Sequence, residues 1–416
     1  MKIAVIGAGP AGMIAAAAAA QSGAHVVIFE KNPKPGRKLL LTGNGRCNVT
    51  NLSKVDDYPE HYFGNGKFLY KALHSFGPED IAEILLESNI RLRVEADGRA
   101  FPESGKAKDV LDALVSRSDR LGVHFRETAS IVDLRKNRAG RIAKAVTLSE
   151  SMDIDACILC TGGSSYPITG SSGDGYLLAA RLGHTIVPPR PALAPVDTDP
   201  ADIVTLQGVS LRGAGVRIIQ GEKCLGKSVG DVLFTHFGLS GPAVLNVSRY
   251  LPANDSEYDG SVCIELDLWP DVPGDEARAK LMAIIADNQN IKLFNALKKL
   301  WPEAILEFLF GRAEVSGDVF CRDFEKEQRK RLLRAIKQLS FRVRRAPLFS
   351  DAIVTSGGVN LKEIDPRTMQ SKLVPGLYFA GEVLDIDGDT GGYNLQAAFS
   401  TGYLAGISAA AGDADR

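Results

Sequence analysis

The strongest constraint on the fold is a set of three glycines, Gly7, Gly9 and Gly12, which lie between an apolar segment and an alanine-rich segment. In a strand–turn–helix unit, the first glycine permits a tight turn and the second lets the backbone approach a pyrophosphate. The third lets the helix pack closely on the sheet, and the N–H groups at the helix N-terminus favour phosphate oxygens. Pro10 and Ala11 begin that helix. The pattern predicts a nucleotide-binding βαβ unit.

The segments on either side complete this pattern. We expect buried strands over residues 3–6 and 25–29, and the second strand is followed by Glu30. A carboxylate at this place can accept hydrogen bonds from ribose hydroxyls, and it repels a 2′-phosphate. The site therefore favours FAD or NAD over NADP. A signal peptide and a βαβ unit with incidental glycines are the alternatives, but the regular glycine spacing and the following strand favour a nucleotide.

A second strand–glycine–helix segment lies near the C-terminus. An expected buried strand ends at Gly381 and Glu382, and Gly391 and Gly392 open a long helix. The N–H groups of such a helix can lie against the pyrimidine edge of a flavin and stabilise negative charge there. Glu382 or Asp385 can hold ribityl hydroxyls. An amphipathic closing helix with a glycine cap is the alternative, but it leaves the repetition of a nucleotide-like unit unexplained.

The order of the expected elements predicts an α/β fold: a Rossmann-like FAD-binding domain, with a parallel sheet and helices, interrupted by an inserted β-rich domain and a helical subdomain. We expect the FAD-binding domain over 1–190 and 346–416. The β-rich domain is expected over 191–272 with about 340–355, and the helical insertion over 273–339. Prolines gathered between residues 188 and 195 mark the first boundary.

Composition limits the class of protein. The chain has 416 residues, of which 45% are hydrophobic and 24% charged, with a net charge of −1. This length allows two or three domains, and the balanced charge gives no global case for binding nucleic acid. No apolar run after the N-terminus is long enough to span a bilayer, so we expect no membrane partner. The oligomeric state stays open.

Six cysteines in a chain of this length do not indicate a disulfide framework. Cys157 and Cys160 form a CxxC pair, which would be compatible with redox or zinc chemistry. They stand in an apolar strand, and the sequence offers no second CxxC or histidine pair to complete a tetrahedral site. We expect both cysteines to pack in the core, and we expect no bound metal.

A glycine-rich loop with basic side chains follows Glu30. Its residues Arg37, Lys38, Arg46 and Asn48 can neutralise the pyrophosphate, position the flavin or bind an anionic part of a substrate. A solvated basic loop is the alternative, but the glycines and the apolar LLLT stretch favour a cofactor role. Further expected cofactor contacts are Lys31, Gly43, Gly45, Thr161, Gly162, Tyr393 and Asn394.

Three side chains are candidates for catalysis. His236 stands at an expected strand-to-helix transition and can act as a general acid that protonates a carbon after hydride transfer; a structural histidine is the alternative. Cys47 follows Arg46, whose charge would lower the pKa of the thiol, and a plain structural cysteine is an equal alternative. Tyr393, beside the expected flavin, is the third candidate.

The chain resembles the BaiN/YhiN-type flavoproteins, which are FAD-dependent oxidoreductases of bacteria. The matching motifs are GAGPAG with Glu30, PGRKLLLTGNGRCNVTN, the TGG after Cys160, HFGLSGPAVLNVSR, TSGGV and GLYFAGEVLDIDGDTGGYN. They span nearly the whole chain in the expected order, and GRCNVTN together with GEVLDIDG is specific to that family. The resemblance implies an FAD domain that carries an inserted β domain, itself interrupted by a helical one.

These features predict a cytoplasmic FAD enzyme that takes a hydride from NAD(P)H and delivers it to an activated C=C bond. A small polycyclic enone and a uracil ring of RNA both present such a bond, conjugated with a carbonyl. Some members of the family that the chain resembles are associated with the reduction of a uridine in ribosomal RNA. The sequence has no second GxGxxG followed by a helix and an acid. NAD(P)H would therefore bind transiently over the flavin, or another donor would reduce it.

Residues 325–345 bear on an RNA partner, because they carry nine basic and two acidic residues. We expect an amphipathic helix with solvated basic side chains and a core-facing side formed by Leu332, Leu333, Ile336 and Leu339. A patch for a polyanion such as RNA is the alternative, although no aromatic residue stands among the basic ones before Phe341. A flavin-stabilised RNA-binding or assembly protein without turnover is the alternative function.

Overall fold

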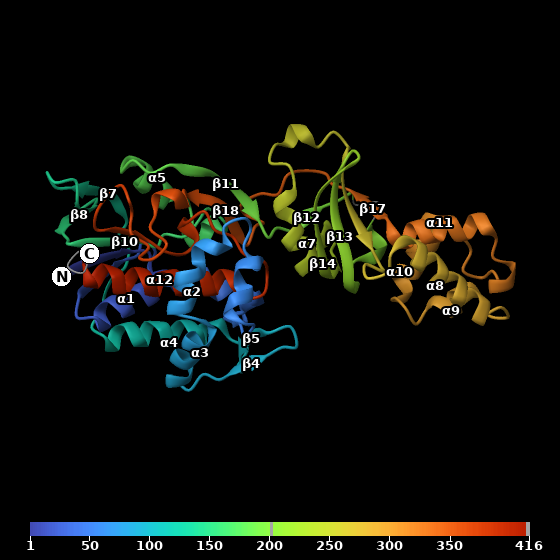
Figure 1. Cartoon of the computed structure of the whole chain (residues 1–416), viewed down its shortest axis with the longest axis horizontal. Helices are drawn as coiled ribbons and strands as arrows, with labels where there is room; N and C mark the ends of the chain where they lie inside the picture. The colour runs from blue at the N-terminus through green and yellow to red at the C-terminus, as the bar shows by residue number, and fades with distance from the viewer. Residues whose placement is uncertain (200–202, 413–416) are drawn as a thin grey trace. The chain divides into compact units, whose positions relative to one another are not determined.

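The computed structural model describes residues 1–199 and 203–412. The chain forms two compact units, one of Met1–Pro191 with Ile353–Arg416 and one of Ala192–Ala352 (Figure 1). Each unit has a hydrophobic core of its own. No helix among the described residues is both long and apolar enough to cross a membrane.

The first unit is built on a five-stranded parallel sheet with the order β19-β10-β1-β2-β6. Its central strands are almost wholly buried and apolar, as expected for a parallel sheet that is covered on both faces. The predicted Rossmann-like arrangement is confirmed. The strands are β1 Lys2–Ile6, β2 His25–Phe29, β6 His124–Arg126, β10 Ala156–Leu159 and β19 Leu377–Phe379.

Two helices from opposite ends of the chain pack side by side in this unit: α1 Pro10–Gln21 and α12 Tyr393–Ala411 (Figure 1). The helix α1 is rich in alanine, and α12 places Gly402 and Gly406 against it. Small residues on both helices let their backbones approach closely. The other helices of this unit are α2 Tyr70–Ser75, α3 Pro78–Glu87, α4 Ala107–Arg120 and α5 Asp174–Arg181.

Three small sheets complete the first unit. The antiparallel meander β7-β8-β9 joins the core of the parallel sheet through buried side chains such as Ile131 and Ile142. Along the chain this meander lies between β6 and β10 of the parallel sheet. The strands are β7 Ile131–Lys136, β8 Ile142–Thr147 and β9 Ser151–Asp153; β3 Thr50–Asn51, β5 Arg99–Pro102 and β4 Leu92–Val94; and β11 Ile186–Ala192 with β18 Val354–Val359.

The second unit contains a six-stranded antiparallel sheet with the order β12-β15-β14-β13-β16-β17. Alternation along its strands buries one face, as Val216 and Ile218 show, and this face shares one core with the helices that follow. The strands are β12 Val196–Asp197, β13 Ser210–Gln220, β14 Lys223–Phe234, β15 Gly238–Ser240, β16 Val262–Asp267 and β17 Leu339–Arg342. The helices are α7 Pro242–Val247, α8 Gly274–Asp287, α9 Leu293–Leu297, α10 Glu303–Ala313 and α11 Lys326–Lys337.

Candidate functional site

The glycine turn after β1 is closed around two of its glycines and open at the third. A Cβ on Gly7 would lie 2.5 Å from the carbonyl oxygen of Cys160, and a Cβ on Gly12 would lie 1.9 Å from the carbonyl oxygen of Gly7. Gly7 also has a φ of +101°, a conformation that favours glycine. A Cβ on Gly9, by contrast, would meet no atom within 4 Å. The turn thus leaves open space where a pyrophosphate would approach the N-terminus of α1.

Glu30 closes the turn from the end of β2. One carboxylate oxygen accepts the backbone N–H of Ala8 at 2.9 Å, and the other accepts the backbone and side-chain N–H groups of Asn32 at 2.8 and 2.7 Å. A carboxylate offers about four acceptor positions, so these bonds leave capacity for a ribose hydroxyl. The buried Glu30 therefore both orders the glycine turn and remains a candidate ribose ligand.

Lys31 and Arg37 lie beside Glu30 but contact protein groups. The Lys31 ammonium pairs with the carboxylate of Asp174 at 2.5 Å and donates to Ser172, at the N-terminus of α5. Burial would raise the pKa of Asp174, but the hydrogen bonds from Lys31 and Ser172 outweigh it, and the pKa is lowered. Arg37 donates to the side-chain oxygen of Asn32 at 3.0 Å. Both basic residues reinforce the loop around Glu30.

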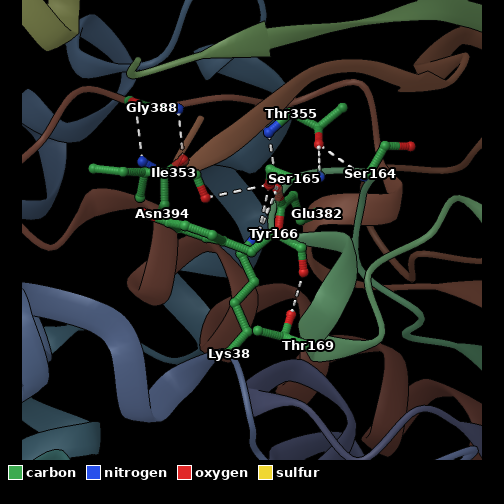
Figure 2. Close-up of polar contacts among 10 residues, drawn as sticks. All are labelled: Lys38, Ser164, Ser165, Tyr166, Thr169, Ile353, Thr355, Glu382, Gly388 and Asn394. Atoms are coloured by element: carbon green, nitrogen blue, oxygen red, sulfur yellow. Dashed lines mark hydrogen bonds and ion pairs between the residues drawn. The ribbon is translucent and has the colours of Figure 1, made fainter. Parts of the chain in front are cut away.

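Lys38 lies in a different network, centred on Glu382. The Lys38 ammonium donates to both carboxylate oxygens of Glu382, at 2.7 and 3.0 Å, and to Ser165 at 2.7 Å. Glu382 also accepts the Ser165 hydroxyl at 2.9 Å and the backbone N–H of Thr355 at 2.8 Å. Figure 2 shows these residues meeting around Glu382 from segments that are far apart in the sequence, with Thr355 in β18. Glu382, expected to hold ribityl hydroxyls, thus joins the loops around the site.

Three residues that sequence reasoning did not assign to the site complete this network: Ser164, Ser165 and Thr355. The Thr355 hydroxyl accepts the backbone N–H groups of Ser164 and Ser165, at 2.8 and 3.0 Å. Thr355 lies in the TSGGV segment, and the two serines directly follow the TGG turn. Both segments are among the motifs that match the family, but the motifs gave these three residues no role. Their positions in the sequence could have indicated this role, because serine and threonine hydroxyls beside glycine turns often bond to backbone groups.

Thr161 begins the turn after β10 and carries a buried hydroxyl with no hydrogen-bond partner, as does Tyr176. Burial, followed by the nearby carboxylates of Glu382 and Asp385, raises the pKa of Tyr176. Buried hydroxyls are normally hydrogen-bonded in folded proteins. Thr161 lies beside the open glycine turn, and the Tyr176 hydroxyl lies near Glu382. Their missing hydrogen-bond partners are consistent with a polar ligand that binds here and accepts from them.

Asp385 and the neighbouring glycines shape the same region. Burial raises the pKa of Asp385, although the Asn65 side chain and the Gly357 N–H bind it. Gly381 has a φ of +75°, and a Cβ there would lie 2.8 Å from the Cβ of Ala11. Gly162 likewise has a φ of +73°. Gly381 thus brings the turn after β19 close to the start of α1, while Gly7 brings the turn after β10 close to the turn after β1.

In the loop of residues 43–48, the environment of Cys47 differs from the expected one. Cys47 has no exposed surface, and burial raises the pKa of its thiol to about 12, against a smaller lowering by Thr42. The pKa lowering expected from Arg46 is therefore wrong. The Arg46 guanidinium lies 4.6 Å from the centre of the Phe101 ring and 3.9 Å from Glu95. A buried, protonated thiol serves packing and not nucleophilic chemistry. Gly43 and Gly45 have φ values of +56° and +81°, and Asn44 and Cys47 also have positive φ values, +55° and +60°.

The start of α12 is held by its own loop. Asn394 accepts the N–H of Gly388 at 2.8 Å and donates to the carbonyl of Gly388 at 2.9 Å, as Figure 2 shows. The Tyr393 ring stacks on His61, with ring centres 4.0 Å apart, and the Nδ1 of His61 lies 3.4 Å from Asp389. Burial is the main cause that raises the pKa of Tyr393. Sequence reasoning missed His61, for which no motif gave a signal.

His236 belongs to the second unit, whereas the network around Glu382 belongs to the first. It is exposed in the turn between β14 and β15 and packs edge-on against the Phe237 ring. The expected strand-to-helix transition is wrong, because β15 intervenes before α7. Cys157 is buried in β10 and Cys160 is buried directly after it, and burial raises the pKa of each thiol.

Comparisons with known proteins give this geometry a context. The model of the HI0933-like protein Rossmann domain matches residues 1–408. The chain is 30% identical over 412 residues to the 3-dehydro-bile acid delta(4,6)-reductase of Clostridium scindens, covering 98% of this chain and 99% of that one. It is 32% identical over 411 residues to the ribosomal RNA dihydrouridine synthase of Haemophilus influenzae, covering 97% of each.

Among solved structures, the 3-ketosteroid delta1-dehydrogenase of Sterolibacterium denitrificans matches with a TM-score of 0.53 and 14% identity, covering 98% of this chain and 99% of that one. This similarity shows a common fold. The parallel sheet, the glycine turn and Glu30 make the first unit a Rossmann-type FAD-binding domain of the oxidoreductase class. With a family match that extends over nearly all of its length, the chain belongs to the HI0933-like Rossmann-domain family.

Proposed function

We propose that this protein is a reductase that uses FAD and NAD(P)H to reduce a C=C bond conjugated with a carbonyl group in a small molecule. The observation that carries the FAD assignment is the open space at Gly9 in a turn that is closed at Gly7 and Gly12. The full-length relative named as a bile acid reductase supports this class of acceptor. The cytoplasm, where NAD(P)H is available, is the expected location.

The residues on the first unit divide the work of holding FAD. Gly9 and the N-terminus of α1 would hold the pyrophosphate, and Glu30 the ribose of the ADP half. The bound flavin supplies hydride transfer. The N-terminus of α12 would stabilise negative charge on its pyrimidine edge, while Lys38 and Glu382 hold the surrounding loops in place.

A proton donor is also needed to complete the reduction of a C=C bond. Tyr393 and His61 are our candidates, because they stack at the start of α12 and Asp389 lies beside His61. The raised pKa of Tyr393 keeps its hydroxyl protonated near neutral pH, as a donor requires. Replacing Tyr393 with phenylalanine should then lower turnover and leave flavin reduction by NAD(P)H unchanged.

The proposal is tested first by cofactor content and reduction. The purified protein should be yellow, and NADH or NADPH under anaerobic conditions should bleach the flavin absorption. A 3-oxo steroid with conjugated double bonds should then restore the colour. A stable flavin that neither nicotinamide reduces would overturn the proposed reductase and point to a binding protein without turnover.

One variant separates loss of FAD from loss of fold. A valine at Gly9 meets no protein atom at its Cβ, so Gly9→Val should fold normally but occupy the space of the pyrophosphate. Gly274→Val is the matched control, since a Cβ there also meets nothing within 4 Å. We expect colourless protein from Gly9→Val and yellow protein from Gly274→Val. After FAD has been removed from all samples, both variants should have the melting temperature of the wild type.

A uridine of ribosomal RNA is a second candidate acceptor. The relative from Haemophilus influenzae carries that name, and α11 exposes Lys326, Lys330 and Arg334 at intervals of four residues, which places them on one face. Phosphate contacts would make binding weaker as salt concentration rises. Deleting the gene and measuring dihydrouridine in ribosomal RNA tests this acceptor; an unchanged level excludes it.

The variants used for RNA binding need care, because some basic residues of α11 have structural contacts. Arg331 donates to the carbonyl oxygens of Ala313 and Glu314, at 2.8 and 3.0 Å, and thereby caps α10. Lys326→Glu with Arg334→Glu changes the exposed face without removing that cap. Salt-sensitive RNA binding that survives this double change would exclude α11 as the RNA-binding surface.

A further inference from the structure

One peptide group before α12 is held at both of its ends. The side chain of Asn51 donates through Nδ2 to the carbonyl oxygen of Gly391, at 3.3 Å. The side chain of Asn48, in the amide orientation that satisfies its neighbours, accepts the N–H of Gly392 at 3.1 Å. This carbonyl and this N–H belong to the same peptide bond. Two asparagines thus fix the orientation of a single peptide plane, which we name the Asn48–Asn51 clamp.

Each asparagine is itself fixed. Asn51 is 2% exposed, and its Nδ2 also donates to the carbonyl of Asp97 at 3.2 Å while its Oδ1 accepts the N–H of Ser53 at 3.0 Å. A Cβ on Gly98 would lie 2.3 Å from that Oδ1, so the pocket around Asn51 is tight. All of the polar atoms in its side chain are therefore used to hold backbone groups.

Asn48 is anchored in the same way. Its amide nitrogen donates to the carbonyl oxygens of Thr50 and Ala100, at 3.1 and 3.3 Å. Both acceptors belong to the small sheet that contains β3 and β5. The clamp therefore ties the start of α12 to a sheet and not to a solvated loop.

The held peptide stands where the backbone has the least intrinsic rigidity. Gly391 and Gly392 have φ values of +124° and +100°. Glycine adopts positive and negative φ about equally readily, so the residue type alone does not fix this conformation. A Cβ on Gly392 would lie 2.3 Å from the carbonyl carbon of Thr50, so no side chain can stiffen this position. Hydrogen bonds from outside the segment are the remaining means of fixing it.

We propose that the Asn48–Asn51 clamp sets the direction of the first N–H groups of α12 and thereby raises the reduction potential of the bound flavin. The inference rests on the proposed function, because it requires FAD in the first unit. The first N–H groups of a helix have no partner within the helix and carry its positive end. They stabilise negative charge best when their orientation is fixed in advance, since no reorganisation is then needed. Asn48 and Asn51 are positioning residues in this scheme.

The test is the midpoint potential of bound FAD in Asn48→Ala, Asn51→Ala and the double variant. Each single change should disfavour reduced flavin about tenfold, which for a two-electron couple is a shift of about 30 mV to more negative potential. Because both side chains hold one peptide, the double change should give less than the sum of the two. Asn137→Ala is the matched control: Asn137 also holds backbone N–H groups, those of Ala139 and Arg141, but in the turn after β7.

A second measurement covers variants that lose FAD. Hydrogen–deuterium exchange of the segment 391–395, compared between wild-type and variant proteins after removal of FAD, should be faster in both clamp variants and unchanged in Asn137→Ala. Wild-type protein that binds no FAD refutes the proposed function and with it the effect on the flavin. Wild-type protein that binds FAD, with potentials or exchange rates that Asn48→Ala and Asn51→Ala leave unchanged, refutes the clamp alone.

Discussion

Lys38 and Glu382 form an ion pair, with 2.7 Å between Nζ and Oε2, that joins two loops 344 residues apart in the sequence. Replacing Lys38 with methionine leaves the partly buried carboxylate without its cation. We expect the free energy of unfolding to fall by about 2 kcal/mol, in the range for hydrogen bonds to charged groups, as measured by urea denaturation. Lys144→Met removes an exposed pair with Asp153 and should change stability by less than about 0.5 kcal/mol. Equal losses would contradict the structural role of Lys38.

Gly402 provides a second prediction, because a Cβ there would lie 2.4 Å from the carbonyl oxygen of Ala11. Gly402→Ala should force α12 away from α1 and lower stability by about 1–3 kcal/mol, the range for overpacking. Gly311→Ala in α10 is the control, since its Cβ meets no atom and alanine favours a helix. Thermal denaturation should therefore show opposite signs for the two changes. A neutral Gly402→Ala would mean that the helices are less closely packed.

His184 predicts a dependence of stability on pH. Burial lowers the pKa of His184, and the nearby carboxylate of Glu363 only partly opposes this shift. The imidazole ring of His184 also forms a hydrogen bond with the Ser371 hydroxyl. The unfolded chain then binds the proton more readily than the folded chain. The free energy of unfolding should fall as the pH drops below about 6.5, by at most about 1.4 kcal/mol per pH unit.

The variant His184→Gln checks this assignment. Glutamine keeps a donor and an acceptor but does not titrate, so urea midpoints measured between pH 5 and pH 8 should depend less on pH than in the wild type. Replacing the exposed His124 with glutamine is the control and should retain the wild-type profile. A wild-type profile in His184→Gln would assign the effect to other groups.

Cys47 should be chemically inert in the folded protein. Its thiol is fully buried and has a pKa of about 12, whereas Cys224 is exposed. The thiolate is the reactive form, so a maleimide at pH 7 should label Cys224 rapidly and Cys47 only after unfolding. Mass spectrometry of the labelled peptides decides this. Fast labelling of Cys47 in the native state would reopen a catalytic role for it.

Local sequence determined the glycine turn, the strand before it and the helix after it. These depend on backbone conformations and apolar patterns within about thirty residues, and Gly7 and Gly12 allow the close backbone contacts of the turn because they lack side chains. The order of such segments along the chain also indicated that the parallel sheet is assembled from both ends of the sequence. The sheet confirms this, because the C-terminal strand β19 pairs with β10, which in turn pairs with the N-terminal strand β1.

Tertiary structure decided what the polar side chains do. Arg46 is adjacent to Cys47 in sequence, yet burial of the thiol dominates its pKa, and burial is set by the packing of distant segments. Lys38 and Asn48 were expected to contact a cofactor, and in the fold they hold Glu382 and Gly392. The sequence by itself thus determined the elements and the class of cofactor. The partners of charged and amide groups were decided only by the fold, because they come from loops that meet once the core has formed.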